Sequence, residues 1–238
     1  MRKLLSIFLF FLAISISSYA QTFEGILQID YRSESGGKNA IDVYVKGDKF
    51  CMQKLYGGCD RYNVYIYDTR TRILSCLSPQ APKTALSLDA DKVMSIYEGK
   101  HLKPGYQVHT SHPYSATVSS KKIGDLHVMQ KKGADQDGSY EIWVSDLKIN
   151  YSDLIPVLRL LGFWGDPEDD DNVILESRTV NKKTSKYSTI NVTPVKTKVE
   201  DELFKIPDVY QLVDLDKFLV NEYKSPRFGD LVKAFTGF

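Results

Sequence analysis

The sequence has few of the residues on which metal sites and catalytic centres depend. Among its 238 residues are only four histidines and three cysteines. His109 and His112 are separated by two residues and could supply two metal ligands, but a structural zinc site needs four ligands and no cysteine lies nearby in the sequence. We therefore predict no metal site and no cofactor.

Motifs of the common enzyme classes are also missing. The sequence contains no Gly-x-Ser-x-Gly elbow, no His-Glu-x-x-His pair and no Gly-x-x-x-x-Gly-Lys phosphate loop. No set of nucleophile, base and orienting group emerges from the remaining pattern. We expect no catalytic residues and predict that the protein is not an enzyme.

Neither charge is in clear excess. The 31 lysines and arginines nearly balance the 30 aspartates and glutamates, so the sequence lacks the basic footprint that binding to a phosphate backbone requires. The densest acidic run, residues 166–171, lacks the alternating ligand spacing and central glycine of an EF-hand loop. Runs of this kind are usually solvated loops. We expect neither nucleic acid nor calcium as a partner.

The first feature that is present is a leader. Arg2 and Lys3 precede an apolar run from Leu4 to Ile16, and small residues lead to Ala20. This pattern is typical of a secretory signal peptide with cleavage near Ala20/Gln21. The run is shorter than the roughly 20 residues of a membrane span, and no cysteine follows it directly at the cleavage site. We expect a periplasmic or extracellular chain that is neither lipid-anchored nor an integral membrane protein.

After the leader, the sequence alternates with the period of β-strands. Leu27, Ile29 and Tyr31 share one parity, while Gln28 and Asp30 share the other. This alternation indicates strands with one buried face. Similar segments separated by short turns recur up to residue 195, and aromatic residues, with 15 tyrosines and 11 phenylalanines, suit strands. The pattern predicts a mainly β (α+β) fold with roughly ten strands in an antiparallel meander.

Two regions depart from this alternation. Leu154, Leu158 and Leu161 have helical spacing and precede Gly162, which predicts one internal helix from 152 to 161. After Val213 the apolar residues again take helical spacing, which predicts two short amphipathic helices that need an apolar surface to cover. We divide the chain into a signal peptide (1–20), a β domain (21–213) and a C-terminal helical extension (214–238).

Export would expose the three cysteines to an oxidising compartment. Cys51 and Cys59 are the nearest pair and could form a disulfide. A tight hairpin would instead place Cys51 opposite a residue near Tyr65, too far from Cys59 for a bond. A buried, weakly reactive thiol is the alternative, and both interpretations stay open from sequence.

Several short stretches, taken in order, resemble an exported bacterial family of unknown function. They are Thr22-Phe23-Glu24-Gly25, Tyr44-Val45-Lys46-Gly47-Asp48-Lys49, the Asp68 turn with Lys83-Thr84, Glu141-Ile142-Trp143-Val144-Ser145, and Leu203-Phe204-Lys205-Ile206-Pro207 before Tyr210. This family is similar to the periplasmic lipoprotein carriers of the LolA/LolB type. The resemblance covers most of residues 22 to 213. It departs at Gly124-Asp125-Leu126-His127, where the family often has Gly-aromatic-x-Cys.

The resemblance implies a strongly curved antiparallel sheet that forms an open half-barrel around an apolar cavity and is covered by a few helices. On this basis we expect an exported binding protein that holds an apolar or lipid-like ligand on the concave face. The alternative is an envelope structural or protein-interaction domain whose interior is plugged and which binds an envelope protein partner. The candidate ligand-binding residues are Leu154, Leu158, Leu161, Phe163 and Trp164.

Overall fold

The computed structural model describes residues 23–34, 36–57, 62–91, 114–136, 138–161, 163 and 172–214. The leader, the C-terminal extension after Asp214 and the acidic run lie outside the described residues. His109, His112, Cys59 and Trp164 lie outside them too.

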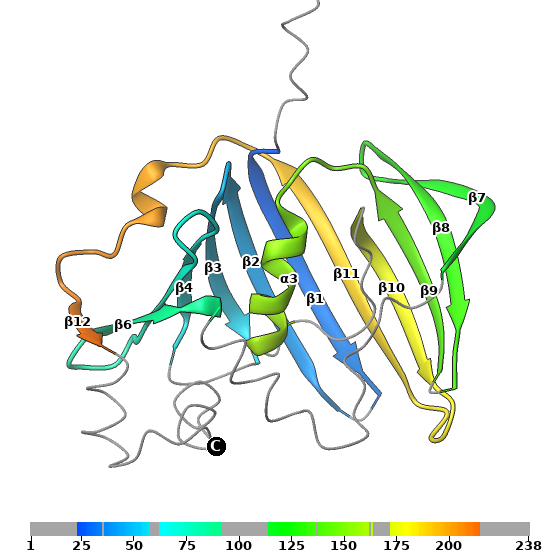
Figure 1. Cartoon of the computed structure of the whole chain (residues 1–238), viewed down its shortest axis with the longest axis horizontal. Helices are drawn as coiled ribbons and strands as arrows, with labels where there is room; N and C mark the ends of the chain where they lie inside the picture. Colours follow the sequence, from blue (N-terminus) through cyan, green and yellow to red (C-terminus); the bar gives the residue numbers. More distant parts are fainter. Residues whose placement is uncertain are drawn as a thin grey trace, which may run out of the picture.

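One twelve-stranded sheet contains every strand of the described chain (Figure 1). Its strands are β1 (Gly25–Ser33), β2 (Lys38–Lys46), β3 (Lys49–Tyr56), β4 (Val64–Asp68), β5 (Ile73–Leu77), β6 (Thr84–Asp89), β7 (Ser115–Ile123), β8 (Leu126–Ala134), β9 (Gly138–Ser145), β10 (Val173–Asn181), β11 (Tyr187–Lys196) and β12 (Gln211–Asp214). Their order is β12-β6-β5-β4-β3-β2-β1-β11-β10-β9-β8-β7. The sheet is curved and has two edges, β12 and β7, so it is an open half-barrel.

This order follows from a simple path of the chain. Strands β1 to β6 proceed from the centre of the sheet to one side, and β7 to β11 return from the other side to the centre, where β11 pairs with β1 from Gly25 to Ser33. All neighbouring strands are antiparallel except β12 and β6, which are parallel. The predicted antiparallel, mainly β fold is confirmed, and the parallel edge is an addition to it.

The predicted alternation gives the sheet an apolar inner face. In register, Leu27 of β1 is opposite Val43 of β2, and Ile29 is opposite Ile41. All four are buried, whereas Gln28, with the other parity, is exposed. Because paired residues share a face, this pattern continues from strand to strand.

Helix α3 (Tyr151–Leu160), the one α-helix with both ends among the described residues, packs against the inner face (Figure 1). Its Leu154, Val157 and Leu158 belong to the same buried cluster as Leu27 and Ile41 of the sheet. The helix predicted from 152 to 161 is therefore confirmed, with bounds shifted by one residue. No helix among the described residues is long and apolar enough to span a membrane.

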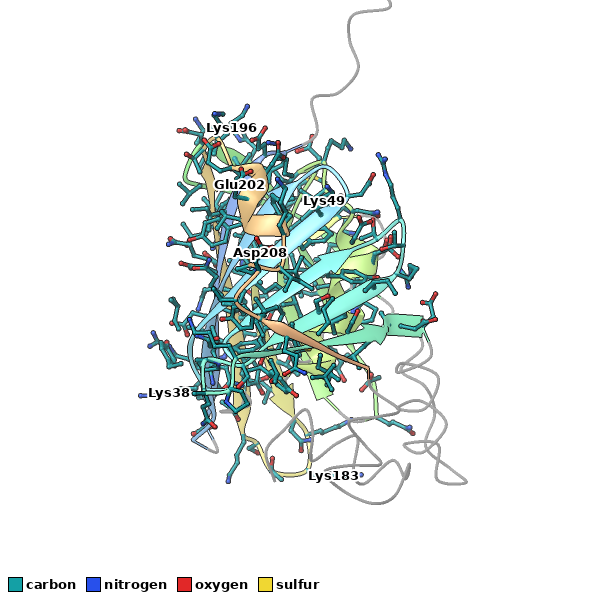
Figure 2. The ribbon with its side chains drawn as sticks, turned by 90° about the vertical axis from the view of Figure 1, so that its left-hand side faces the viewer. Lys38, Lys49, Lys183, Lys196, Glu202 and Asp208 are labelled. Carbon is teal, nitrogen blue, oxygen red and sulfur yellow. The ribbon has the colours of Figure 1, made fainter. Side chains whose placement is uncertain are left out.

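A second, smaller apolar cluster lies on the outer face. After β11 the chain crosses the outside of the sheet, through a 3-10 helix η1 (Asp201–Phe204), and then reaches β12 (Figure 2). We call residues 197–210 the strap. Figure 2 shows its Glu202 and Asp208 in front of the strands. Side chains of the strap pack on the outer cluster of Cys51, Ile66, Leu77 and Ala85.

Candidate ligand-binding face

The inner face is the largest apolar surface that the described strands build. Its central strands contribute aliphatic side chains, and β3 and β4 add aromatic ones. Phe50 of β3 is opposite Tyr67 of β4, and their ring centroids are 6.4 Å apart in a stacked arrangement. Across the sheet, the face continues through Ile142 of β9 and Val192 of β11, both buried. The inner face is therefore the apolar core of the half-barrel.

The predicted ligand-binding residues lie in the packed interior. Leu154, Leu158 and Phe163 are 0% exposed, and Leu161 is 5% exposed. All four belong to the inner-face cluster, so they contact the sheet and not an open groove. Trp164 lies outside the described residues. Leu154, Leu158, Leu161 and Phe163 thus lie inside the half-barrel, while the role of all five residues toward a ligand stays a prediction.

A polar cluster joins the sheet to the beginning of α3. Arg72, in the turn between β4 and β5, donates from Nη1 to Asp153 of α3 at 2.5 Å. It also donates from Nε and Nη2 to Asp91 Oδ1 at 3.0 and 2.7 Å. We call Arg72, Asp91 and Asp153 the Arg72 cluster. The hydrogen bonds from Arg72 lower the pKa of Asp91.

Sequence reasoning did not find the Arg72 cluster. Arg72 and Asp153 are 81 positions apart, and no local spacing relates them. Arg72 also adopts a positive φ of 58°, a conformation that is uncommon for residues other than glycine. The only sequence feature that pointed to the cluster was Arg72 itself, at the end of the Asp68 turn, and in the sequence it resembles an ordinary surface charge.

Tyr67 lies beside this cluster on the inner face. It is 0% exposed, and its ring centroid is 5.8 Å from Arg72 Cζ. Its hydroxyl has no hydrogen-bond partner in the described part of the chain. Burial raises the pKa of Tyr67 to about 12. The hydroxyl therefore keeps its proton at physiological pH and is available as a donor.

Cys51 and Cys76 lie on opposite faces of the sheet. Cys51 is opposite Ile66, one residue from the Tyr65 that a hairpin register predicts, and it is buried in the outer cluster. Cys76 is opposite Tyr65 and belongs to the inner cluster. Burial raises the pKa of Cys51 to about 11, which makes its thiol unreactive. Neither thiol forms a disulfide within the described residues, but Cys59 lies outside them and its pairing with Cys51 stays a prediction.

Within the described ranges, no group of three His, Cys, Asp or Glu side chains could hold a metal ion. His127 of β8 is exposed. Next to the apolar side chains, the Tyr67 hydroxyl and the Arg72 guanidinium group are two hydrogen-bond donors.

Comparison with known proteins yields matches only at the level of structure. No protein-family model and no curated protein matches the sequence. One similar structure is an uncharacterized conserved protein from Thermus thermophilus, with a TM-score of 0.44, 10% identity, and coverage of 80% of this chain and 91% of that chain. MucB in complex with MucA(peri) has a TM-score of 0.39 and 13% identity, with coverage of 79% of this chain and 57% of MucB.

A LolA superfamily protein, NE2245 from Nitrosomonas europaea, is also among the similar structures. Its TM-score is 0.32 at 11% identity, with coverage of 79% of this chain and 92% of that chain. Because all three TM-scores are low, what these proteins bind is not transferred to this chain.

Proposed function

We propose that the protein is an exported binding protein that holds an apolar or lipid-like ligand on the inner face of its half-barrel. The observation that carries this proposal is the continuous apolar inner face, buried from Leu88 of β6 to Ile142 of β9. Curved β-architectures with apolar linings commonly hold such ligands. The leader pattern of residues 1–20 supports delivery to the periplasm or the medium.

The position of α3 limits how a ligand can bind. Its Leu154 and Leu158 fill the middle of the inner face, so a ligand lies beside the helix or displaces it. Removing a fully buried leucine from its contacts is costly, about 1.5–3 kcal/mol in transfer free energy alone. Equivalent apolar contacts from an acyl chain would offset that loss, whereas a polar ligand would not.

The second candidate function is an envelope structural or protein-interaction domain. The full burial of Leu154, Leu158 and Phe163 favours it, because a plugged interior needs no ligand. In this case a partner protein would bind elsewhere. The edge strand β7 offers backbone groups for such pairing, although its Lys121 and Lys122 and a register shift between Ala116 and Ser120 are features that usually protect an edge.

Photo-crosslinking with an acyl chain that carries a diazirine group separates the two candidates. Because successive side chains of a strand face opposite sides, the parity of the labelled residues reports the face that binds. On β2, we expect labelling at Ile41 and Val43 of the inner face and not at Asp42 and Tyr44 of the outer face. An excess of unlabelled lipid should abolish the labelling.

Labelling restricted to outer-face or edge residues would contradict the proposal and favour a surface interaction. A complete lack of competable labelling would favour a plugged interior. A thermal melt of each labelled sample checks that the protein stayed folded during the reaction.

A further inference from the structure

The hydroxyl of Tyr67 is an unusual group for a packed interior. Buried polar atoms almost always have a hydrogen-bond partner, and an unpaired one costs about 1–3 kcal/mol. Tyr65, two residues earlier on the same strand and the same face, follows the rule: its hydroxyl donates to the carbonyl of Tyr62 at 3.3 Å. Tyr67 is equally buried but has no such bond among the described residues.

The protonation state of Tyr67 defines what it can bind. Desolvation raises its pKa to about 12, so the phenol is neutral at every physiological pH and presents one O–H donor. A partner for this group is a hydrogen-bond acceptor. The surrounding surface of Phe50 and Leu74 is apolar and buried, so the rest of the partner molecule must be apolar too.

The charges around Tyr67 further restrict the acceptor. One guanidinium and two carboxylates give the Arg72 cluster a formal charge of minus one. Arg72 already directs Nε, Nη1 and Nη2 to Asp91 and Asp153, so it is not free to neutralise an additional anion. Asp68 at the end of β4 adds negative charge near the phenol. A ligand carboxylate would meet repulsion here, whereas an uncharged carbonyl would not.

From these observations we infer that Tyr67 donates a hydrogen bond to the bound ligand, and that the ligand is an acyl chain with a neutral acceptor such as an ester or amide carbonyl. The chain occupies the inner face and its carbonyl lies at the end of the face near the Arg72 cluster. This inference rests on the proposed function and assigns the polar contact and chemical class of its ligand.

Three probes of equal chain length test the inference: pyrene-labelled dodecane, methyl dodecanoate and dodecanoic acid. Their affinities are measured by fluorescence titration on the wild type, Tyr67→Phe and the matched control Tyr65→Phe. For the wild type near neutral pH we expect the ester to bind more tightly than either the hydrocarbon or the acid. In Tyr67→Phe the affinity for the ester should fall roughly five- to tenfold, to that for the hydrocarbon, because one hydrogen bond is lost.

The stability of the ligand-free variants provides an independent readout. Tyr67→Phe removes an unpaired buried hydroxyl, so its melting temperature should equal or exceed that of the wild type. Tyr65→Phe removes a satisfied hydrogen bond, so it should melt at a lower temperature while its ratio of ester to hydrocarbon affinity stays at the wild-type value.

Two other outcomes are decisive. If the ester and the hydrocarbon bind and Tyr67→Phe changes neither affinity, the hydroxyl contacts only water and the inference is wrong, while the proposed function stands. If none of the three probes binds the wild type, the proposed function fails and the inference fails with it.

Discussion

At the residue scale, Arg72 connects three parts of the chain that are distant in sequence. It lies in the turn before β5 and bonds Asp91 after β6 and Asp153 in the first turn of α3. Each exposed ion pair usually contributes about 0.2–1 kcal/mol. The Arg72 side chain is 33% exposed, so its two pairs are partly shielded from water.

Replacing Arg72 tests this connection. We expect Arg72→Gln to lower the free energy of unfolding by about 1 kcal/mol near neutral pH, because two carboxylates lose their partner. Arg70→Gln is the matched control, since Arg70 lies in the same turn. Its Nε pairs with Asp48 at 2.5 Å, and its side chain is 79% exposed. Urea unfolding of both variants at equal ionic strength measures the difference.

The effect of Arg72→Gln should depend on pH in a defined direction. The pKa of Asp91 is lowered in the folded protein by its hydrogen bonds from Arg72. The contribution of Asp91 to the free energy of unfolding is therefore complete above its unfolded pKa of about 3.9. This contribution disappears as the pH falls through the folded pKa. The stability difference between wild type and variant should shrink in acid. A difference that grows in acid would contradict the assignment.

At the element scale, the strap covers the outer cluster and packs against it. It is attached at its start by Lys46, whose Nζ donates to the Val199 carbonyl at 3.0 Å and pairs with Asp201 at 2.9 Å. Further along, Leu203, Phe204, Ile206 and Tyr210 pack against the outer face of β3 to β6. The strap thus stabilises the outer face of these strands, whereas α3 packs on the inner face.

Phe204→Ala tests the contribution of the strap. We expect the free energy of unfolding to fall by about 1–2 kcal/mol, less than for a fully buried phenylalanine because Phe204 is half-buried. Val209→Ala, at a strap position that is 66% exposed, should change it by less than about 0.5 kcal/mol. Equal losses in chemical denaturation would show that the packing of the strap on the outer cluster contributes nothing.

The elements differ in how well the sequence predicted them. Alternation predicted β1 and helical spacing predicted α3, because burial on one side imposes a period on the apolar residues of both elements. Strand β7 was missed because it is an edge strand with no buried residue, so nothing selects alternation in Ser115–Ile123. Strand β12 was missed because its four residues are ordered by pairing with β6, a contact that sequence pattern does not encode.

The same distinction applies to the candidate site. Leu154, Leu158, Leu161 and Phe163 were predictable as interior residues from their spacing and apolar character, and the structure places them there. Tyr67 and the Arg72 cluster were not predictable, because they depend on contacts between β4, the turn before β5 and α3. The apolar part of the face could be predicted from local sequence pattern, whereas its polar end is formed by residues that are far apart in the sequence.

At the scale of the whole molecule, the curved sheet separates two apolar clusters with different coverings. The outer cluster is covered by the strap of the chain itself. The inner cluster extends over most of the sheet and is covered, in the described chain, by the short helix α3 (Figure 1). The proposed ligand site lies on the inner face, whose apolar side chains come from most strands of the sheet.

Native mass spectrometry of the mature protein, purified from the compartment to which it is exported, tests the central claim most directly. The account predicts the mass of residues 21–238 plus a bound acyl-containing lipid, which collisional activation releases and lipid analysis identifies. The mass of the unliganded chain alone, or of a stoichiometric complex with another protein and no lipid, would contradict it.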